Sequence, residues 1–529
     1  MEKIVLFVRR LDIKIHRNIL IIISMLYVYV PVFIFAATWL RPIFAIMSCL
    51  MMTLALVLYF RHLIVSMKTE SDKIFSINVI FLVIIAIFIF LVGIICGWSG
   101  YGYQFDDWAK HNAILHDLLE RSWPVIYRNN GQTSFLTYYI GQYLTPAFIG
   151  KLFHLSFRMV LLFNWLWSSL GLVLVYIMFT YVSSAKSVKQ KFFCFIMLVF
   201  CGGLMSLQQE IGNSIYPEYI GIGLGGWQDY FLCYGKYMLQ YRTNFISLFG
   251  AFGQTIIPWL VVSIFYTCRK DVKNYLPLLL PVMLCGTFSF VAIAALAVAA
   301  YIVYVIKTAN WKIILKDTFS IQNCLMAISL GAVLFLYFLG YLMQKKPDGM
   351  ALIVVTYYGS DIGIYLIYVL GSFLLYALLI AKENIRNCLF LTTVALMLIF
   401  PFFKMGSAND LLMGTGIVTS FVLYICVAQF LFQRSADPAK TESYTIRKGA
   451  LIVLILIGFI KPSVELYNNI DKYNYRAYSP YDAYLTLEKF ADRNNESIPI
   501  DLRYNYYTYD AADSPFMKYI GDTKVLKTD

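Results

Sequence analysis

Long apolar segments separated by short polar stretches recur along the chain from about residue 19 to residue 460. A transmembrane helix needs roughly 20 predominantly apolar residues, so this pattern is typical of a polytopic helical membrane protein. The predicted spans are residues 19–39, 42–60, 74–97, 159–182, 192–207, 245–267, 275–287, 289–306, 320–343, 361–381, 388–402, 412–433 and 449–460. We therefore expect an all-α fold with about 13 transmembrane helices.

Two apolar regions need separate interpretation. The stretch from Leu276 to Ile306 is too long for one span, and Gly286 interrupts it, so we expect two helices there. Residues 133–153 are apolar but rich in Tyr, Gly, Gln and Pro. Because Tyr is favoured at membrane–water interfaces, we expect this segment to be a helix lying at the outer interface and not a span.

Basic residues fall on one side of the membrane if the predicted spans alternate. The clusters are residues 1–18, Arg61–Lys73, Lys186–Lys191, Arg269–Lys273, Lys307–Lys316, Lys382–Arg386 and Arg434–Lys448. Cytoplasmic loops of membrane proteins carry an excess of Lys and Arg. We therefore expect a multi-pass protein of the cell (plasma or inner) membrane, with a cytoplasmic N-terminus and an extracytoplasmic C-terminus.

The spans divide the chain into three segments. Residues 1–73 form an N-terminal two-helix hairpin, which we expect at the periphery, residues 74–460 form the transmembrane body, and residues 461–529 form an extracytoplasmic tail. The body has two long outer loops, residues 98–158 and 208–244. Together with the tail they lie on one face, so we expect chemistry or recognition there. The tail is too short for an independent catalytic domain of ordinary size, and we expect it to fold over the outer face.

The composition agrees with a membrane protein. The chain is 60% hydrophobic and 14% charged, with a net charge of +13. In a soluble protein this charge would suggest nucleic acid, but here cytoplasmic loops account for it, and we expect no nucleic-acid partner. The ten cysteines are dispersed, so neither a disulfide framework nor a zinc site is expected.

The first long loop contains the clearest candidate for catalysis. Asp106 and Asp107 follow a span by a few residues and precede Trp108, Lys110 and His111. A carboxylate beside a dry helical wall can have a raised pKa and act as a base. Adjacent carboxylates can also hold a divalent cation such as Mg²⁺ or Mn²⁺. Alternatively, one of them caps the helix expected from Trp108 to Arg121.

Two further outer segments carry candidate ligands. Lys236 and Arg242 precede the span that begins near residue 245, where they could bind a lipid phosphate or simply anchor the protein to headgroups. Asn409 and Asp410 lie in a short outer turn and could bind a sugar hydroxyl or a cation, or could cap the helix that follows.

Two absences narrow the function. The spans contain essentially no Asp, Glu, Lys or Arg, whereas ion-coupled transporters place such residues in mid-membrane. The sequence also has no P-loop motif, so the use of ATP is not supported.

Several short motifs resemble the GT-C superfamily of membrane glycosyltransferases, in particular a family of bacterial GT-C-like integral membrane proteins. The resemblance is carried by DDWAKHNAILHDLLERSWPVIY (106–127), LTYYIGQYLTPAFIGKLF (136–153), QYRTNFISLFGAFGQTIIPWL (240–260), SANDLLMG (407–414) and SPFMKYIGD (514–522). It implies a GT-C-like fold with interfacial helices. It also implies an inverting glycosyltransferase whose donor is a polyprenyl-phosphate-linked sugar and whose acceptor is a cell-surface glycan, lipid or protein.

The resemblance also implies roles for individual residues. Asp107 matches the acidic catalytic position best, Asp106 is the second choice, and Arg242 or Lys236 would stabilise the leaving phosphate. Further substrate contacts would come from Lys110, His111, Gln254, Asn409 and Asp410. The chain differs from similar proteins at Gly414, where they tend to carry an arginine.

Three other functions remain open on the sequence. A flippase or exporter of lipid-linked oligosaccharide would tolerate loss of both Asp106 and Asp107. A surface-polysaccharide polymerase or ligase would depend more on Arg242 than on Asp107. A catalytically silent membrane scaffold would depend on none of these residues.

Overall fold

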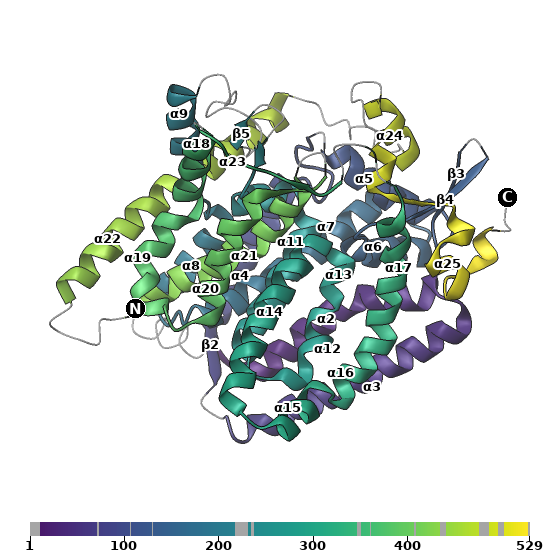
Figure 1. Ribbon diagram of the computed structural model, residues 1–529, viewed down its shortest axis with the longest axis horizontal. Coiled ribbons are helices and arrows are strands. Elements are labelled where there is room, and N and C mark those ends of the chain that lie inside the picture. Colours follow the sequence, from purple (N-terminus) through teal and green to yellow (C-terminus); the bar gives the residue numbers. More distant parts are fainter. Residues whose placement is uncertain are drawn as a thin grey trace.

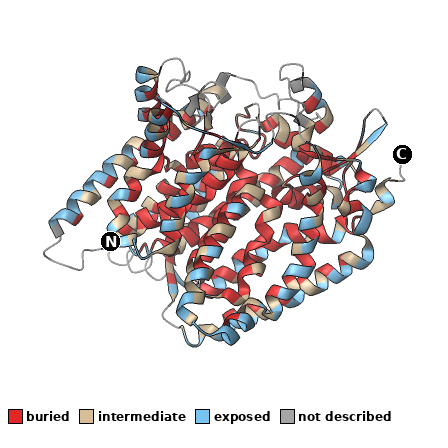
Figure 2. Cartoon of the chain, in the orientation of Figure 1, coloured by how far each residue is buried: buried red, intermediate tan, exposed pale blue. Residues whose placement is uncertain are grey.

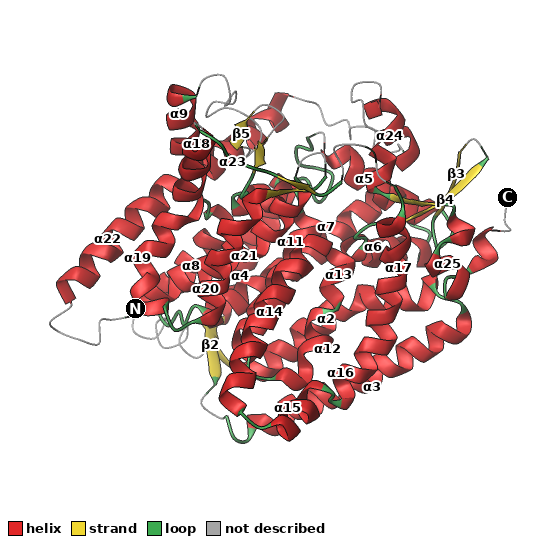
Figure 3. Cartoon of the chain, viewed as in Figure 1, coloured by secondary structure: helices red, strands yellow, loops and turns green. Residues whose placement is uncertain are grey.

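In the computed structural model the chain is built almost wholly from helices, joined by loops and a few short strands (Figure 3). The structure describes residues 11–70, 73–105, 107–129, 131–216, 231–233, 237–345, 347, 351–359, 361–406, 409–433, 441–475, 486–495 and 502–526. The predicted all-α fold class is confirmed.

Within the described residues, nine helical segments are long and apolar enough to cross a membrane. They are Arg17–Trp39, Pro42–Met67, Phe157–Val182, Val188–Ile215, Thr287–Thr308, Trp311–Met343, Asp361–Asn384, Asp410–Phe432 and Glu442–Lys472. Each of these segments overlaps a predicted span, and together they are consistent with a polytopic helical membrane protein. The other predicted spans coincide with shorter apolar helical segments, Val79–Ile95, Phe252–Cys268, Val272–Cys285 and Cys388–Phe402. The total of about 13 therefore stays a prediction.

Five of the long segments are single helices and four are interrupted. The single helices are α2 (Arg17–Trp39), α3 (Pro42–Met67), α7 (Phe157–Val182), α14 (Thr287–Thr308) and α21 (Asp410–Phe432). The interrupted segments comprise α8 (Val188–Phe200) with α9 (Met205–Ile215), α15 (Trp311–Thr318) with α16 (Ile321–Met326) and α17 (Ala332–Met343), α18 (Asp361–Val369) with α19 (Leu375–Asn384), and α22 (Thr441–Gly458) with α23 (Ile460–Tyr475). The π-helical turns η2 (Ala327–Gly331) and η3 (Leu370–Leu374) continue two of them.

The remaining helices are short. They are α4 (Val79–Ile95), α5 (Asp107–Glu120), α6 (Gly141–Leu152), α10 (Asn244–Gly250), α11 (Phe252–Cys268), α12 (Tyr275–Leu279), α13 (Pro281–Cys285), α20 (Cys388–Ile399), α24 (Leu487–Asn495) and α25 (Pro515–Tyr519). The predicted interruption near Gly286 is confirmed, because α13 ends at Cys285 and α14 begins at Thr287. A fully extended φ of −175° at Gly286 separates the two helices.

Small β-structures lie on the two opposite sides of the helical body (Figure 1). On one side β1 (Asp12–His16) pairs antiparallel with β2 (Ile74–Asn78), close to the N-terminal end of the chain. On the other side β3 (Ile126–Asn129), β4 (Gln132–Leu136) and β9 (Tyr507–Tyr509) form a three-stranded sheet. Two further pairs join β5 (Phe231–Cys233) to β6 (Tyr237–Leu239) and β7 (Ile353–Val354) to β8 (Phe403–Lys404).

The segment 133–153 differs from the single interfacial helix that we predicted. Its first residues belong to β4, and only Gly141–Leu152 is helical, as α6. The break has a tertiary cause, since Ser134 to Leu136 pair with Tyr509 to Tyr507 of the C-terminal tail. This pairing gives the tail an antiparallel edge to dock on, which the sequence pattern of 133–153 did not show.

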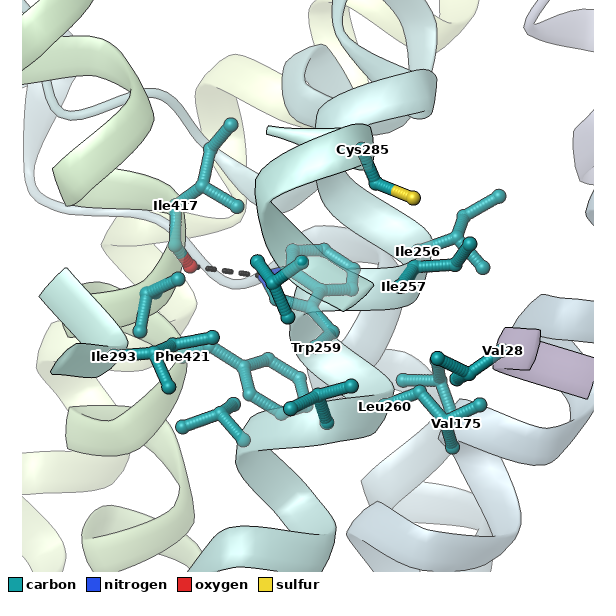
Figure 4. Close-up of a cluster of buried hydrophobic side chains, with 14 of the residues drawn as sticks. Val28, Val175, Ile256, Ile257, Trp259, Leu260, Cys285, Ile293, Ile417 and Phe421 are labelled. Atoms are coloured by element: carbon teal, nitrogen blue, oxygen red, sulfur yellow. Dashed lines mark hydrogen bonds between the residues drawn. The ribbon is translucent and has the colours of Figure 1, made fainter. Parts of the chain in front are cut away.

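Buried residues form one continuous core that includes side chains from all three predicted segments (Figure 2). Figure 4 shows its centre, where the Trp259 indole of α11 donates a 2.9 Å hydrogen bond to the carbonyl of Ile417 in α21. The same indole stacks on Phe421 at 4.8 Å between ring centroids. Lipid tails are as apolar as Leu, so helices associate in a membrane through such close packing and hydrogen bonds.

Only the second helix of the N-terminal hairpin is peripheral, whereas we expected both helices at the periphery. Tyr29 of α2 is 1% exposed, and its hydroxyl donates a 2.6 Å hydrogen bond to the carbonyl of Pro277. By contrast, α3 presents large exposed apolar side chains such as Leu50 and Leu54. Such an exposed apolar surface suits contact with lipid, so the first helix belongs to the body and the second lies at its edge.

Candidate functional site

The turn between α4 and α5 determines where the Asp107 carboxylate is placed. Gly97 has a φ of +79°, a conformation that favours glycine. A Cβ on Gly102 would lie 1.7 Å from the carbonyl oxygen of Ile94, so any side chain there would displace the backbone. These two glycines allow the chain to fold back on the end of α4, and α5 begins at Asp107. The predicted helix 108–121 is thus confirmed within one residue.

Two tryptophans attach this turn and α5 to α10. The indole of Trp98 donates a 2.9 Å hydrogen bond to the Leu248 carbonyl, and that of Trp108 donates a 3.1 Å bond to the Phe249 carbonyl. The Trp108 ring also stacks on Phe252 at 5.2 Å. Both indoles are buried, so the start of α5 is held against α10 by packing and by satisfied donors.

His111 is a neutral positioning residue within this contact. Its Nε2 lies 3.2 Å from the Gly250 carbonyl, and its Nδ1 lies 2.5 Å from the Tyr143 hydroxyl. The carbonyl can only accept, so Nε2 carries the proton and Nδ1 accepts from Tyr143. Burial, with a further contribution from the charge of Lys110, lowers the pKa of His111 to about 3. Since the ring is 2% exposed, its observed role is to join α5, α6 and α10.

Asp107 lies between two cations that come from different segments of the chain. Its carboxylate is 3.8 Å from Lys110 Nζ, and its side chain is 39% exposed. Burial acts to raise the pKa of Asp107, but the charges of Lys110 and Arg242 outweigh it and hold the pKa below its ordinary value. Asp107 is therefore ionised at neutral pH, contrary to the raised pKa that the sequence suggested.

Arg242 reaches the same place from the segment that precedes α10. Its Nε donates a 3.2 Å hydrogen bond to Gln240, and a Cβ on Gly250 would lie 3.4 Å from its Nη1. Gly250 is also the partner of His111, so Arg242 and α5 meet at the end of α10. The structure thus brings together Asp107, Lys110, His111 and Arg242, and their role in a shared site stays a prediction.

Asp410 approaches this region from the opposite end of the sequence. It is the first residue of α21, and the loop before it turns at Gly406, which has a φ of +83°. A Cβ on Gly406 would lie 2.2 Å from a carboxylate oxygen of Asp410, so a residue with a side chain there would collide with the carboxylate. Gly406 therefore leaves room for the Asp410 carboxylate at the N-terminal end of α21.

Tyrosines connect the two carboxylates. We call Tyr138, Tyr139, Tyr143, Tyr341 and Tyr506 the tyrosine group. Burial raises the pKa of Tyr506 well above its usual value, and the charges of both Asp107 and Asp410 raise it further. Burial likewise raises the pKa of Tyr143 and of Tyr139, with a further contribution from the charge of Asp107 for Tyr143 and of Asp410 for Tyr139. Asp107 and Asp410, far apart in sequence, therefore both act on the Tyr506 hydroxyl.

Gln254 belongs to this region as well. Its Nε2 donates a 2.7 Å hydrogen bond to the Tyr139 hydroxyl, and Tyr138 in turn donates to Tyr139. The side chain is 4% exposed, and its Oε1 has no hydrogen-bond partner in the part of the chain that the structure describes. A buried amide oxygen of this kind is suited to accept a hydrogen bond from a ligand hydroxyl.

The C-terminal tail is clamped onto α5 and the segment that follows it, and it supplies Tyr506. Asp117 of α5 is 1% exposed, and its carboxylate accepts a 2.9 Å hydrogen bond from the Leu487 amide at the start of α24. Arg121 forms a 2.6 Å ion pair with Glu488. The Thr137 amide also donates a 2.8 Å hydrogen bond to the Tyr506 carbonyl. The tail is therefore packed against α5 and the segment that follows it.

Of the other predicted site residues, Asn409 has a different role and two lie outside the described residues. Asn409 is the N-cap of α21, accepting from the Leu412 amide at 3.4 Å and donating to the Met238 carbonyl at 2.9 Å. It is 1% exposed, which supports the capping alternative. Asp106 and Lys236 lie outside the described residues.

Gly414 has a packing role at the contact between α21 and α14. A Cβ at this position would lie 2.6 Å from the Cβ of Phe288 in α14. The Gly414 carbonyl also accepts a 3.0 Å hydrogen bond from Ser289. An arginine at this position would separate α21 from α14, so the glycine permits their close approach.

The cation hypothesis remains a prediction. Among the described residues, His, Cys, Asp and Glu side chains nowhere gather in groups of three or more that could hold a metal ion. Asp106 lies outside those residues, so the predicted Asp106–Asp107 pair is not tested.

Sequence reasoning missed the tyrosine group and the docking role of Asp117. The Tyr-rich composition of the tail and the Tyr138–Tyr139 pair were the available signals for the tyrosines. The sequence carried no signal for the docking role of Asp117, because a buried carboxylate on a helix is identified only by its partners in the fold.

No protein-family model, curated protein or solved structure matches the chain.

Proposed function

We propose that the chain is a membrane glycosyltransferase that transfers a sugar from a polyprenyl-phosphate donor to an extracytoplasmic glycan, lipid or protein acceptor. The observation that carries the proposal is the ionised Asp107 flanked by Lys110 and Arg242 at one end of the helical body. A glycosyl transfer from a lipid phosphate needs these parts together, because a proton must leave the acceptor while negative charge develops on the phosphate.

In the proposed reaction the acceptor hydroxyl oxygen attacks the anomeric carbon and its proton passes to Asp107. The bond between that carbon and the phosphate oxygen breaks, and its electron pair stays with the departing polyprenyl phosphate. Lys110 and Arg242 stabilise the charge gained by the phosphate. Attack opposite the leaving group inverts the anomeric carbon. The tyrosine group, Gln254 and Asp410 would supply hydrogen bonds to sugar hydroxyls.

The direct test compares variants of purified, membrane-reconstituted full-length protein with a panel of polyprenyl-phosphate hexoses. Asp107→Asn should reduce sugar transfer about a hundredfold to ten-thousandfold, the usual range for a general base. Asp513→Asn is the matched control, because Asp513 is an exposed carboxylate of the tail. Unchanged transfer by both Asp106→Asn and Asp107→Asn proteins would reject the proposal.

The position of Arg242 keeps one alternative open, a surface-polysaccharide polymerase or ligase. Such an enzyme would depend on an outer arginine, and Arg242 lies beside the charged end of α5. Arg242→Ala would then reduce product formation more than Asp107→Asn does. If Asp107→Asn reduces product formation more than Arg242→Ala does, the result favours the lipid-phosphate-sugar transferase. If neither substitution impairs function, the result favours a flippase.

A further inference from the structure

A second charged region lies at the ends of α11, α14 and α19, near the corner where α14 meets α15, opposite α5 and α24 (Figure 1). It is a pocket of about 380 Å³ into which Arg269, Lys270, Lys307 and Arg386 all project. These four residues come from three separate parts of the chain, the end of α11, the last turn of α14 and the end of α19. We expect this side to face the cytoplasm, because the basic clusters gather on it.

The lining of this basic pocket contains four cationic side chains and no carboxylate. Lys270, Lys307 and Arg386 are exposed, and among the described residues none of the three forms an ion pair. Arg269 is held in place, since its guanidinium lies 4.9 Å above the Tyr266 ring and donates to the Tyr266 carbonyl. Like charges that converge in this way repel one another unless an anion lies between them.

Nearby carboxylates are engaged elsewhere. Glu383 forms a 2.6 Å ion pair with Arg447, and Asp317 forms a 3.3 Å ion pair with Lys273. Asp317 also accepts a 2.6 Å hydrogen bond from the Tyr304 hydroxyl. The charge of the basic pocket is therefore left for a ligand to neutralise.

The wall of the pocket is apolar and belongs to a helix of membrane-spanning length. Ala300 and Val303 of α14 line it, and neighbouring α14 residues Ile302 and Ile306 are exposed as lipid-facing side chains would be. A ligand that fits both surfaces carries an anionic phosphate beside an apolar chain. Basic pockets between transmembrane helices on the cytoplasmic side commonly hold such headgroups.

We propose that this pocket binds the phosphate headgroup of an anionic phospholipid, with an acyl chain lying along α14. The site is separate from the candidate transferase site and does not depend on it. Arg269 and Arg386 also line a neighbouring cavity of about 1020 Å³, which contains further basic residues such as Lys186 and Lys191. The neighbouring cavity also includes Asp12 and Glu383, so the cation-only pocket is the headgroup site.

The test titrates phosphatidylglycerol into the purified full-length protein and measures the apparent Kd by native mass spectrometry. Each basic residue near an anionic lipid surface contributes about fivefold to binding, so Lys307→Gln/Arg386→Gln should weaken it roughly thirtyfold. The matched control, Lys312→Gln/Lys316→Gln, removes the same charge from exposed α15 positions outside the pocket and should leave the Kd nearly unchanged. Lys307→Arg/Arg386→Lys, which keeps the charge, should retain binding.

Three results would overturn the proposal. Equal loss in the pocket and α15 variants would show a diffuse attraction to the basic face. Equal affinity for phosphatidylcholine would remove the role of net charge. Displacement of the lipid by an equal concentration of glycerol phosphate would show that the acyl chain contributes nothing, making the ligand a soluble phosphate. Melting temperatures of all variants establish that each is folded.

Discussion

The two charged regions of the molecule differ in how their charges are arranged. At the candidate transferase site, the carboxylate of Asp107 lies among Lys110 and Arg242. In the basic pocket on the other side, four cations meet without a carboxylate. A site with both a carboxylate and cations can accept a proton and stabilise an anion in the same reaction step. A site that contains only cations can bind an anion but has no group to accept the proton. The arrangement of charge is therefore the reason that we propose catalysis at the Asp107 site and only binding in the basic pocket.

The same comparison extends to the way the side chains are supported. The candidate transferase site rests on buried indoles, a neutral buried histidine and a clamped tail, with Trp108, His111 and Asp117 each 2% exposed or less. Three of the four cations of the basic pocket are exposed at the ends of helices. Catalytic geometry has to be held by packed neighbours, while a headgroup can be bound by mobile side chains.

The largest expected effect separates the two regions directly. Asp107→Asn should lower sugar transfer about a hundredfold to ten-thousandfold and leave the Kd for phosphatidylglycerol unchanged. In detergent solution, Lys307→Gln/Arg386→Gln should weaken the binding of phosphatidylglycerol and leave sugar transfer unchanged. Transfer is measured as labelled sugar moved to acceptor, and binding by native mass spectrometry. The distinction fails if either variant damages both readouts while remaining folded.

A large effect on stability is expected beneath the candidate transferase site. Gly414→Arg should destabilise the protein by about 1–3 kcal/mol or more, because the new side chain overpacks the contact with Phe288. It should therefore lower the melting temperature and not increase transfer. Gly449→Arg is the control, because a Cβ at Gly449 has no atom within 4 Å among the described residues. A Gly414→Arg protein with a normal melting temperature would contradict the packing role.

Salt should affect the two regions unequally. Raising the ionic strength from about 0.1 M to 1 M shortens the Debye length from about 10 Å to about 3 Å. Binding of phosphatidylglycerol to the exposed cations should weaken roughly two- to fivefold, while the part-buried contact of Asp107 with Lys110 is less screened. The two quantities are measured over the same salt series. A parallel decline of transfer and binding would show that both regions act through diffuse charge.

The smallest expected effect is that of pH between 5 and 8. Neighbouring cations hold the pKa of Asp107 below its ordinary value of about 3.9. The carboxylate therefore keeps its charge across this range, and transfer should fall only as the pH drops below about 4. His111, with a pKa of about 3, stays neutral throughout. The pH–rate profile checks this, with tryptophan fluorescence recorded in parallel to detect unfolding; a midpoint between pH 6 and 7 would contradict it.

What the sequence determined by itself is the set of local properties. Apolar length predicted the helices that could span a membrane, charge predicted one basic face, and the pattern from Trp108 to Arg121 located α5 within one residue. The interruption at Gly286 was also visible. These features depend on residues close together in the chain, so neighbouring positions are enough to identify them.

Only the tertiary structure decided which distant residues meet. It placed Arg242, Asp410 and Tyr506 around the end of α5, packed α2 into the body, and paired β4 with β9. It also showed that His111 is neutral and that the pKa of Asp107 is lowered. These outcomes depend on how helices pack and which groups become buried together, and periodicity along the chain carries no information about that.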